Sequence, residues 1–263
     1  MAASEKNQNF LIGINKPSGI TSHDVVNTCR KILGEKRIGH MGTLDPLATG
    51  VMLIGVGSAA RLNQYLEAAD KTYVVTAQFG KVTSTYDSEG EELRTGIVPP
   101  KIMEEKFVKQ YLADWVGTYM QVPPPYSAIK VNGKPSYKAA RMGEEVDLPA
   151  REVEIFSTEL RELETSSWTF EVSVSKGTYI RSLVHDIGQD LGCGAHVTAL
   201  ERTAIGDILL EDCRTVEQLE VDKYKNDIQI LDAAQILGFP VIEADEKMMK
   251  RISNGNSLRN DSK

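Results

Sequence analysis

The stretch from Gly39 to Gly50 constrains the fold of this chain more than any other part of the sequence. It contains several glycines, Pro46 and a single carboxylate, Asp45, and it leads directly into the apolar run 51–56. Glycine permits backbone angles that other residues avoid, and proline fixes its own φ angle. We therefore expect a tight loop that feeds a buried strand.

Asp45 is the side chain of this loop best suited to chemistry. The proline after it disfavours the right-handed helical region, so Asp45 should be extended at the tip of the loop, where a carboxylate can meet a ligand. The alternative is that Asp45 caps the short turn 47–49, which is the commoner role of an Asp-Pro pair. The presence of His40 in the same loop favours the first interpretation.

Composition excludes several classes of protein. A hydrophobic content of 41% and a charged content of 25% are typical of a globular domain. No apolar run approaches the roughly 20 residues that span a bilayer. Residues 1–9 lack the apolar segment of a signal peptide and indicate a short disordered lead-in. The cysteines (Cys29, Cys193 and Cys213) have neither zinc-site nor disulfide spacing, which indicates a cytoplasmic protein.

Charge is distributed unevenly along the chain. A net charge of -7 argues against a general polyanion binder. Basic residues nevertheless outnumber acidic ones in 15–40, and 126–141 carries Lys130, Lys134 and other bases with no acid. A positive face on an acidic body can steer a polyanion to one site, although both clusters could equally be ordinary solvated surface.

Hydrophobic periodicity predicts a mixture of helices and strands. Strands are expected at 10–14, 51–56, 72–79, 152–159, 168–175, 195–205 and 239–242. Helices are expected at 22–33, 59–68, 100–115, 136–142 and 180–191, with two short ones after 205, and 81–96 is expected to be a loop. Because strands and helices do not alternate strictly, the pattern favours an α+β layered sheet over a doubly wound one.

The segment 55–60 raises an alternative function, because it imitates the G-x-G-x-x-A turn of dinucleotide-binding proteins. That turn also requires an acidic residue at the end of the next strand to bind the ribose. The next strand ends in Gln78, Phe79, Gly80 and Lys81, with no acid. A nucleotide-cofactor enzyme is therefore disfavoured.

Six short stretches that follow one another along the chain indicate the function together more clearly than any one of them does alone. They are residues 15–22, 39–50, 70–73, 124–130, 175–181 and 192–197. Over residues 10–206 this pattern resembles the TruB family of tRNA pseudouridine synthases. The resemblance implies an α+β fold with a mixed, largely antiparallel central sheet flanked by helices. It also implies isomerisation of the uridine at position 55, in the T loop of tRNA, without a cofactor.

The resemblance also implies a domain division and a set of site residues. Residues 1–238 would form the catalytic domain, and 239–263 the start of a C-terminal PUA-like domain. Asp45 matches the catalytic residue, Arg181 the arginine that pairs with it, and Tyr73 the tyrosine that stacks on the target base. Tyr179 and Leu200 match residues of the uridine pocket. Without the resemblance, Tyr73, Tyr179 and Leu200 are plausible core residues and Arg181 an ordinary surface arginine.

The remaining expectations concern the substrate. His40 matches a residue that fills the space left by flipped nucleotides, and Lys16, Lys130 and Lys134 are candidate phosphate contacts. The other histidines are too scattered to form a metal site with His40. We expect a monomer that binds the T-arm of tRNA, with no membrane and no obligate protein partner. A non-catalytic RNA-binding or RNA-folding module on the same scaffold is the main alternative.

Overall fold

The computed structural model describes residues 9–66, 68–127, 129–131, 134–136, 142, 147–238 and 240–258. Its framework is a ten-stranded sheet in the order β14-β1-β3-β12-β4-β11-β10-β7, with β13 beside β12 and β2 beside β3. Neighbouring strands are antiparallel except for the pairs β1–β14 and β12–β3. The predicted α+β class with a mixed, largely antiparallel sheet is confirmed.

The strands of this sheet are β1 (Phe10–Lys16), β2 (Ile38–Met41), β3 (Thr49–Val56), β4 (Lys71–Phe79), β7 (Gly117–Gln121), β10 (Arg151–Leu163), β11 (Ser167–Val174), β12 (Ala195–Ile205), β13 (Ile208–Leu209) and β14 (Cys213–Arg214). Two small hairpins pair β5 (Lys81–Thr83) with β6 (Glu92–Thr95), and β8 (Lys130–Val131) with β9 (Lys134–Pro135). The helices are α1 (Ser22–Leu33), α2 (Asn63–Leu66), α3 (Glu105–Ala113), α5 (Ile180–Asp190), α6 (Val216–Lys225), α7 (Ala233–Leu237) and α8 (Glu246–Ser253). Short 3₁₀ segments are η1 (Gly57–Leu62), η2 (Pro100–Met103) and η3 (Leu210–Asp212).

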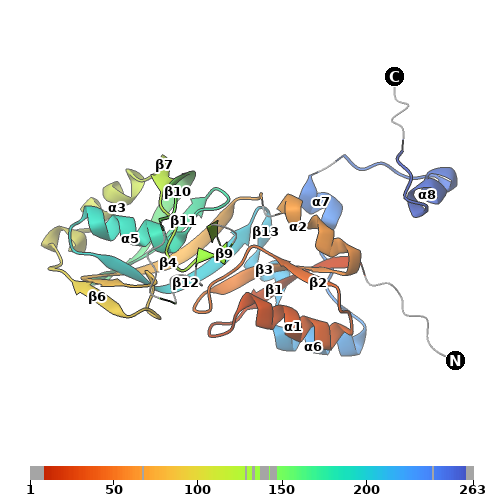
Figure 1. Cartoon of the computed structure of the whole chain (residues 1–263), viewed down its shortest axis with the longest axis horizontal. Coiled ribbons are helices and arrows are strands. Elements are labelled where there is room, and N and C mark those ends of the chain that lie inside the picture. Colours follow the sequence, from red (N-terminus) through yellow and green to blue (C-terminus); the bar gives the residue numbers. More distant parts are fainter. Residues whose placement is uncertain are drawn as a thin grey trace, which may run out of the picture.

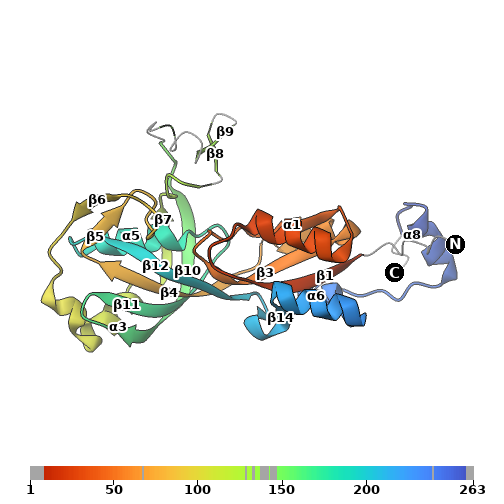
Figure 2. The ribbon, with the colours of Figure 1, turned by 90° about the horizontal axis from the view of Figure 1, so that it is seen from below.

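Strand β12 joins two halves of the sheet. Along most of its length it pairs with β4, and at Glu201 and Arg202 it also pairs with Thr49 and Gly50 of β3. Helix α1 lies beside β2 and α6, and α6 lies beside β1, whereas α5 lies beside β12 and β4, and α3 lies beside β10 (Figures 1 and 2). The loop between β2 and β3, which carries Asp45, therefore lies where the two halves meet.

Helix α1 shows how local sequence sets the start and end of an element. The side chain of Thr21 accepts a hydrogen bond from the backbone of Asp24, whose carboxylate accepts one from the backbone of Thr21. Gly34 ends the helix in the left-handed conformation, with a φ of 70°. This capping fixes the point at which β1 passes into α1, directly beside the Asp45 loop.

Several expectations require correction. The predicted helix 59–68 is instead η1 followed by α2, and Tyr65 is 49% exposed rather than inward. A 3₁₀ turn holds 3.0 residues instead of 3.6, so side chains after it face other directions. The predicted loop 81–96 contains the β5–β6 hairpin, which the sequence hid because every residue of β6 is exposed.

The chain after residue 205 also differs from expectation. Its described part contains α6, α7 and α8 rather than two helices, and residues 240–242 do not form the predicted strand. Most of the predicted helix 136–142 lies outside the described residues. No helix in the described part of the chain is long and apolar enough to cross a membrane.

Candidate active site

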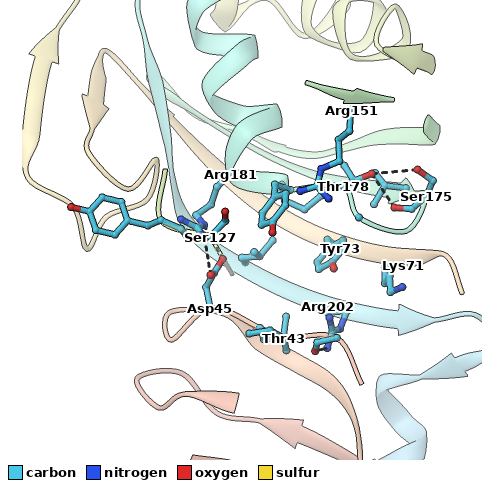
Figure 3. A pocket seen from close by; sticks show the side chains of 18 residues that line it. Thr43, Asp45, Lys71, Tyr73, Ser127, Arg151, Ser175, Thr178, Arg181 and Arg202 are labelled. Carbon is cyan, nitrogen blue, oxygen red and sulfur yellow. Dashed lines mark hydrogen bonds and ion pairs between the residues drawn. The ribbon is translucent and has the colours of Figure 1, made fainter. Parts of the chain in front are cut away.

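A cavity of about 300 Å³ opens where the two halves of the sheet meet (Figure 3). Its walls come from the loop 42–45, from strands β4 and β12, from Tyr126 and Ser127, and from the turn between β11 and α5. The structure brings five of the predicted site residues into this cavity: Asp45, Tyr73, Tyr179, Arg181 and Leu200. Lys16 and His40 do not line it. The side chains of Lys130 and Lys134 lie outside what the structure describes.

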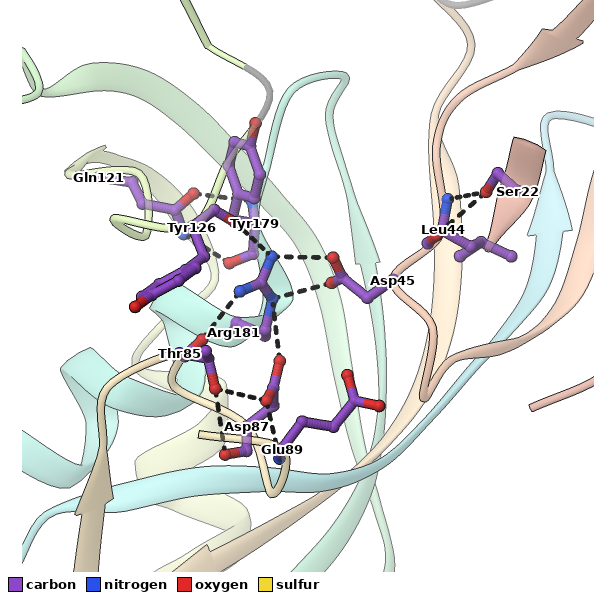
Figure 4. Close-up of polar contacts among 10 residues, drawn as sticks. All are labelled: Ser22, Leu44, Asp45, Thr85, Asp87, Glu89, Gln121, Tyr126, Tyr179 and Arg181. Carbon is purple, nitrogen blue, oxygen red and sulfur yellow. Dashed lines mark hydrogen bonds and ion pairs between the residues drawn. The ribbon is translucent and has the colours of Figure 1, made fainter. Parts of the chain in front are cut away.

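Asp45 and Arg181 form a two-point ion pair across the cavity edge (Figure 4). Arg181 donates from Nε to Asp45 Oδ2 at 2.8 Å and from Nη2 to Asp45 Oδ1 at 2.8 Å. Such a fork fixes the orientation of the carboxylate as well as its position. The Arg181 side chain is 5% exposed whereas that of Asp45 is 31% exposed, so the carboxylate is the accessible member. Asp45 therefore does not use its carboxylate to cap the turn 47–49.

Arg181 makes two further hydrogen bonds, both to backbone carbonyls. Nη1 donates to the Thr85 carbonyl at 2.8 Å, and Nη2 also donates to the Tyr126 carbonyl at 3.0 Å. A second carboxylate, Asp87, lies 3.6 Å from Arg181 Nε and is itself held by the Thr85 hydroxyl. Arg181 is thus a buried hub, and its guanidinium has little freedom to leave Asp45.

Thr85, Asp87 and Tyr126 were missed by sequence reasoning. Thr85 and Asp87 belong to the turn inside the β5–β6 hairpin, in a segment that was expected to be a loop. Each lies about a hundred positions from Arg181 in the chain. The available signal was the acid Asp87 within a run of turn-forming residues, and it gives no hint of its partner.

The Asp45 loop is tied to the start of α1. The Ser22 hydroxyl donates to the Leu44 carbonyl at 3.0 Å and accepts from the Leu44 N–H at 2.9 Å. The Gly19 N–H donates to the Pro46 carbonyl at 2.8 Å. Backbone groups on both sides of Asp45 are therefore fixed by a neighbouring element rather than by solvent.

Lys16 occupies a different place from the one expected. Its side chain is fully buried, and Nζ donates to the carbonyls of Pro17 at 2.9 Å, Pro46 at 3.1 Å and Ala48 at 2.7 Å. Burial lowers the pKa of this ammonium, while the nearby Asp45 carboxylate opposes the shift. The expectation that Lys16 contacts phosphate is wrong for this structure, because the ammonium is enclosed. Lys16 instead stabilises the Asp45 loop by donating hydrogen bonds to its Pro46 and Ala48 carbonyls.

Arg202 holds the loop from its two ends. It donates from Nε to the Val51 carbonyl at 2.7 Å and from Nη2 to the Gly42 carbonyl at 3.0 Å. Gly50 has a φ of 103°, and a Cβ there would lie only 2.2 Å from the backbone oxygen of Arg202. The glycine is required for this close approach. Sequence reasoning missed Arg202, whose role depends entirely on the packing of β12 against the loop.

Aromatic and apolar side chains complete the cavity. Tyr73 on β4 and Leu200 on β12 are buried side chains that line it. Tyr179 immediately precedes α5, and its backbone is fixed by buried Gln121. Its N–H donates to Gln121 Oε1 at 2.8 Å, and its carbonyl accepts from Gln121 Nε2 at 3.1 Å. The cavity therefore combines the Asp45–Arg181 ion pair with the aromatic and apolar side chains of Tyr73, Tyr179 and Leu200, against which a flat ring can pack.

His40 lies half-buried in β2, opposite Ile54 of β3. It precedes the loop that carries Asp45, but the structure does not place it in the cavity wall. Within the described residues, no group of three or more His, Cys, Asp or Glu side chains is arranged to hold a metal ion.

Three arginines, Arg151, Arg181 and Arg202, line the cavity and are called the arginine wall below. A second group of titratable side chains lies close to Arg181. The ring of His185 on α5 stacks on that of Tyr86, with centroids 3.7 Å apart. Burial lowers the pKa of His185 to about 4 and raises the pKa of its neighbour Asp186 to about 6. Tyr86 lies between Thr85 and Asp87, so this stack supports the turn that contacts Arg181.

Comparisons with known proteins identify relatives of this chain. Residues 30–180 match the family described as TruB family pseudouridylate synthase (N terminal domain), and 181–236 match the tRNA pseudouridylate synthase B C-terminal domain. The chain is 44% identical over 220 residues to tRNA pseudouridine synthase B of Opitutus terrae, covering 84% of this chain and 90% of that protein. It is 43% identical over 261 residues to the protein of that name from Bacillus anthracis, covering 95% and 84%.

Solved structures give similar backbones. A chain in the crystal structure of a Cbf5-Nop10-Gar1 complex superposes with a TM-score of 0.63 at 32% identity, covering 83% of this chain and 56% of that one. A chain in the structure of an H/ACA RNP bound to a substrate RNA containing 2'-deoxyuridine gives a TM-score of 0.61 at 29% identity, covering 86% and 62%. This chain thus spans less than two thirds of these solved chains.

Proposed function

Because the chain belongs to the TruB family and is a tRNA pseudouridine synthase, we propose that it isomerises the uridine at position 55 in the T loop, with Asp45 as the essential group. The observation that carries this proposal is the two-point contact between Asp45 and Arg181 at the edge of a cavity. It holds one partly exposed carboxylate in a defined orientation beside a space that can take a nucleotide.

The reaction places definite demands on such a site. The bond between N1 and C1′ must break, C5 must bond to C1′, and the proton on C5 must leave as N1 gains one. A base within a loop must first leave its stack before an enzyme can act on it. A carboxylate can add covalently to a sugar or base carbon, or remove a proton. The fixed position of Asp45 suits each of these roles.

The cavity supports the other half of the proposal, which is capture of the flipped base. The ring of Tyr73 offers a stacking surface, and Tyr179 and Leu200 enclose the same space. The Tyr73 hydroxyl is also a candidate for proton transfer once the base is bound. Substrate and product have the same atoms, so the isomerisation consumes no co-substrate, and we propose, as the family resemblance implies, that it proceeds without a cofactor.

Substrate capture outside the cavity remains part of the proposal. We assign Lys130 and Lys134 to phosphate contacts with the T-arm and His40 to the space vacated by flipped nucleotides. We also expect a monomer that works in the cytoplasm. The three cysteines are unpaired and buried, in keeping with a reducing compartment.

The test is incubation of this chain with an unmodified tRNA transcript, followed by nucleoside analysis for pseudouridine. We expect modification of the transcript and of a short T-arm hairpin, and none when cytidine replaces uridine at position 55. Binding without pseudouridine would instead support the non-catalytic RNA-binding alternative. Modification of another uridine would show that the assignment of the position is wrong.

A further inference from the structure

Arg151 is an arginine of the cavity wall that the mechanism above does not use. It is the first residue of β10, and Figure 3 shows it in the wall near Thr178. Its guanidinium carbon is 4.8 Å from the centroid of the Tyr179 ring, in a cation–π contact. The register of the sheet pairs Arg151 with Gln121, the residue that fixes the Tyr179 backbone.

Two of the three guanidinium nitrogens of Arg151 are buried without a hydrogen-bond partner in the structure. Nε and Nη2 are shielded from solvent and have no hydrogen-bond partner, and no carboxylate of the described residues lies within ion-pair distance. Buried donors are nearly always paired, so an exception indicates a missing partner. Arg181 and Arg202, the other two arginines of the wall, donate to carbonyl or carboxylate oxygens.

The surroundings of Arg151 favour an anionic partner from the substrate. Its side chain lies between the Tyr179 ring and the turn at Gly177, where an added Cβ would be 3.5 Å from Nη1. Arg151 lines the cavity, and Nη1 is not among its shielded nitrogens, so a partner entering from the cavity meets Nη1 first and reaches Nε or Nη2 only if the guanidinium turns. A guanidinium matches the paired oxygens of a phosphate group in both charge and geometry. A uridine that enters the cavity brings its own phosphates with it.

We propose that Arg151 binds a backbone phosphate of the RNA strand, at or next to the flipped uridine. This inference rests on the proposed function, because it requires the target nucleotide to occupy this cavity. The phosphate contact would leave the Tyr179 ring free to meet the base on the cavity side. Arg151 would then locate the nucleotide relative to Asp45 without taking part in the chemistry.

Salt dependence provides the first test. Each phosphate contact contributes a slope of about 0.7 to log affinity against log salt for a single strand. We expect Arg151→Gln to weaken binding of an unmodified T-arm hairpin roughly tenfold and to make this slope shallower by about that amount. Arg151→Lys should keep the slope. All variants would carry Asp45→Asn, so that no turnover occurs during the titration.

Arg161, also on β10, provides a matched control. It is about half exposed and pairs with Glu159 and Glu171, away from the cavity. Arg161→Gln removes the same charge from the same strand and should leave the slope unchanged. An unchanged slope in Arg151→Gln would overturn the inference, and a lowered melting temperature with that unchanged slope would show that Arg151 only supports Tyr179.

A second measurement does not depend on whether Arg151→Gln folds. Hairpins with a neutral methylphosphonate on either side of the target uridine would be titrated against the chain with Arg151 intact. We expect roughly tenfold weaker binding at one of these positions, and little further loss when Arg151→Gln is added. Equal binding of all hairpins would overturn the inference. Failure of the wild-type chain to make pseudouridine would instead overturn the proposed function.

Discussion

The two sides of the cavity differ in how completely their polar groups are paired. On the Asp45 side, Lys16, Ser22 and Arg202 fix the backbone carbonyls of the loop, and Asp45 itself is held by Arg181. On the opposite side Arg181 is also paired, but Arg151 has donors without acceptors. The comparison indicates that the Asp45 carboxylate is held in position without a ligand, whereas Arg151 retains donors that a ligand of the proposed kind would pair.

Asp45→Asn is expected to have the largest effect. The amide retains the shape of the side chain but loses the charge, the nucleophile and the ion pair with Arg181. We predict no detectable pseudouridine in a tRNA transcript, with most of the RNA affinity retained. Nucleoside analysis after single-turnover incubation measures pseudouridine formation, and fluorescence anisotropy measures RNA affinity. Appreciable turnover would remove Asp45 from its assigned role.

Arg202→Met tests whether the Asp45 side is held as tightly as the contacts suggest. The substitution leaves the Val51 and Gly42 carbonyls without their buried donor. We expect the free energy of unfolding to fall by about 2–4 kcal/mol, the range for a broken buried network, and the rate of the chemical step to fall about tenfold or more. Urea unfolding and single-turnover kinetics measure the two effects.

Gly42→Ala is a matched probe of the same contact. Gly42 has a φ of 73°, and an added Cβ would lie 3.3 Å from Arg202 Nη1. Because an Ala at this left-handed φ is strained whatever its neighbours, Gly42→Ala should slow the chemical step in both backgrounds, but less in Arg202→Met if the contact with Arg202 matters. Full additivity of the two substitutions would mean that the effect of Gly42→Ala comes from backbone strain and not from Arg202.

The site could be predicted from sequence only where its residues carry local patterns. The loop from Gly39 to Gly50 has its proline and glycines in a recognisable arrangement, and the prediction of a buried strand after it is confirmed in β3. The burial of Lys16 could not be foreseen, because lysine is rarely buried. It depends on carbonyls of Pro46 and Ala48, which only the folded chain brings together.

The arginine wall was harder to predict for the same physical reason. Arg181 follows a turn at Gly177, which a sequence can indicate, but its contacts with Thr85, Asp87 and Tyr126 join distant segments. Strand β6 has no buried residue, so the hairpin that positions Asp87 lacks a hydrophobic pattern. Arg151 likewise has no local signal, since its significance lies in the donors that it leaves unpaired.

Tyr73 provides a smaller, sharper test of substrate capture. Tyr73→Phe retains the ring and removes the hydroxyl, whereas Tyr73→Leu removes both. If stacking holds the flipped base, Leu should weaken binding of a T-arm hairpin by about 1–3 kcal/mol, and Phe should preserve it. A loss of turnover in Phe with normal binding would assign the hydroxyl to proton transfer. If Leu binds and reacts as Tyr does, Tyr73 is only a strand residue.

The smallest expected effect concerns the stack behind the arginine wall. The pKa of His185 falls from 6.5 to about 4, so its contribution to stability is complete above about pH 6.5 and is lost as pH falls through 4. The pKa of Asp186 rises from 3.8 to about 6, so its contribution is complete below about pH 3.8 and is lost as pH rises through 6. Between about pH 4 and 6, the His185 contribution to stability increases with pH whereas the Asp186 contribution decreases, so the two effects oppose each other.

Single substitutions should separate these opposed slopes. In Asp186→Asn, stability should rise between about pH 4 and 6.5, because only the His185 contribution remains. In His185→Asn, it should fall between about pH 4 and 6. Each change should be about 1 kcal/mol, because both side chains are partly exposed and solvent screens part of the shift. Urea midpoints across this range measure them, with a far smaller slope expected in the wild-type chain. Parallel profiles in the three proteins would show that burial does not shift the pKa values of His185 and Asp186 in these directions.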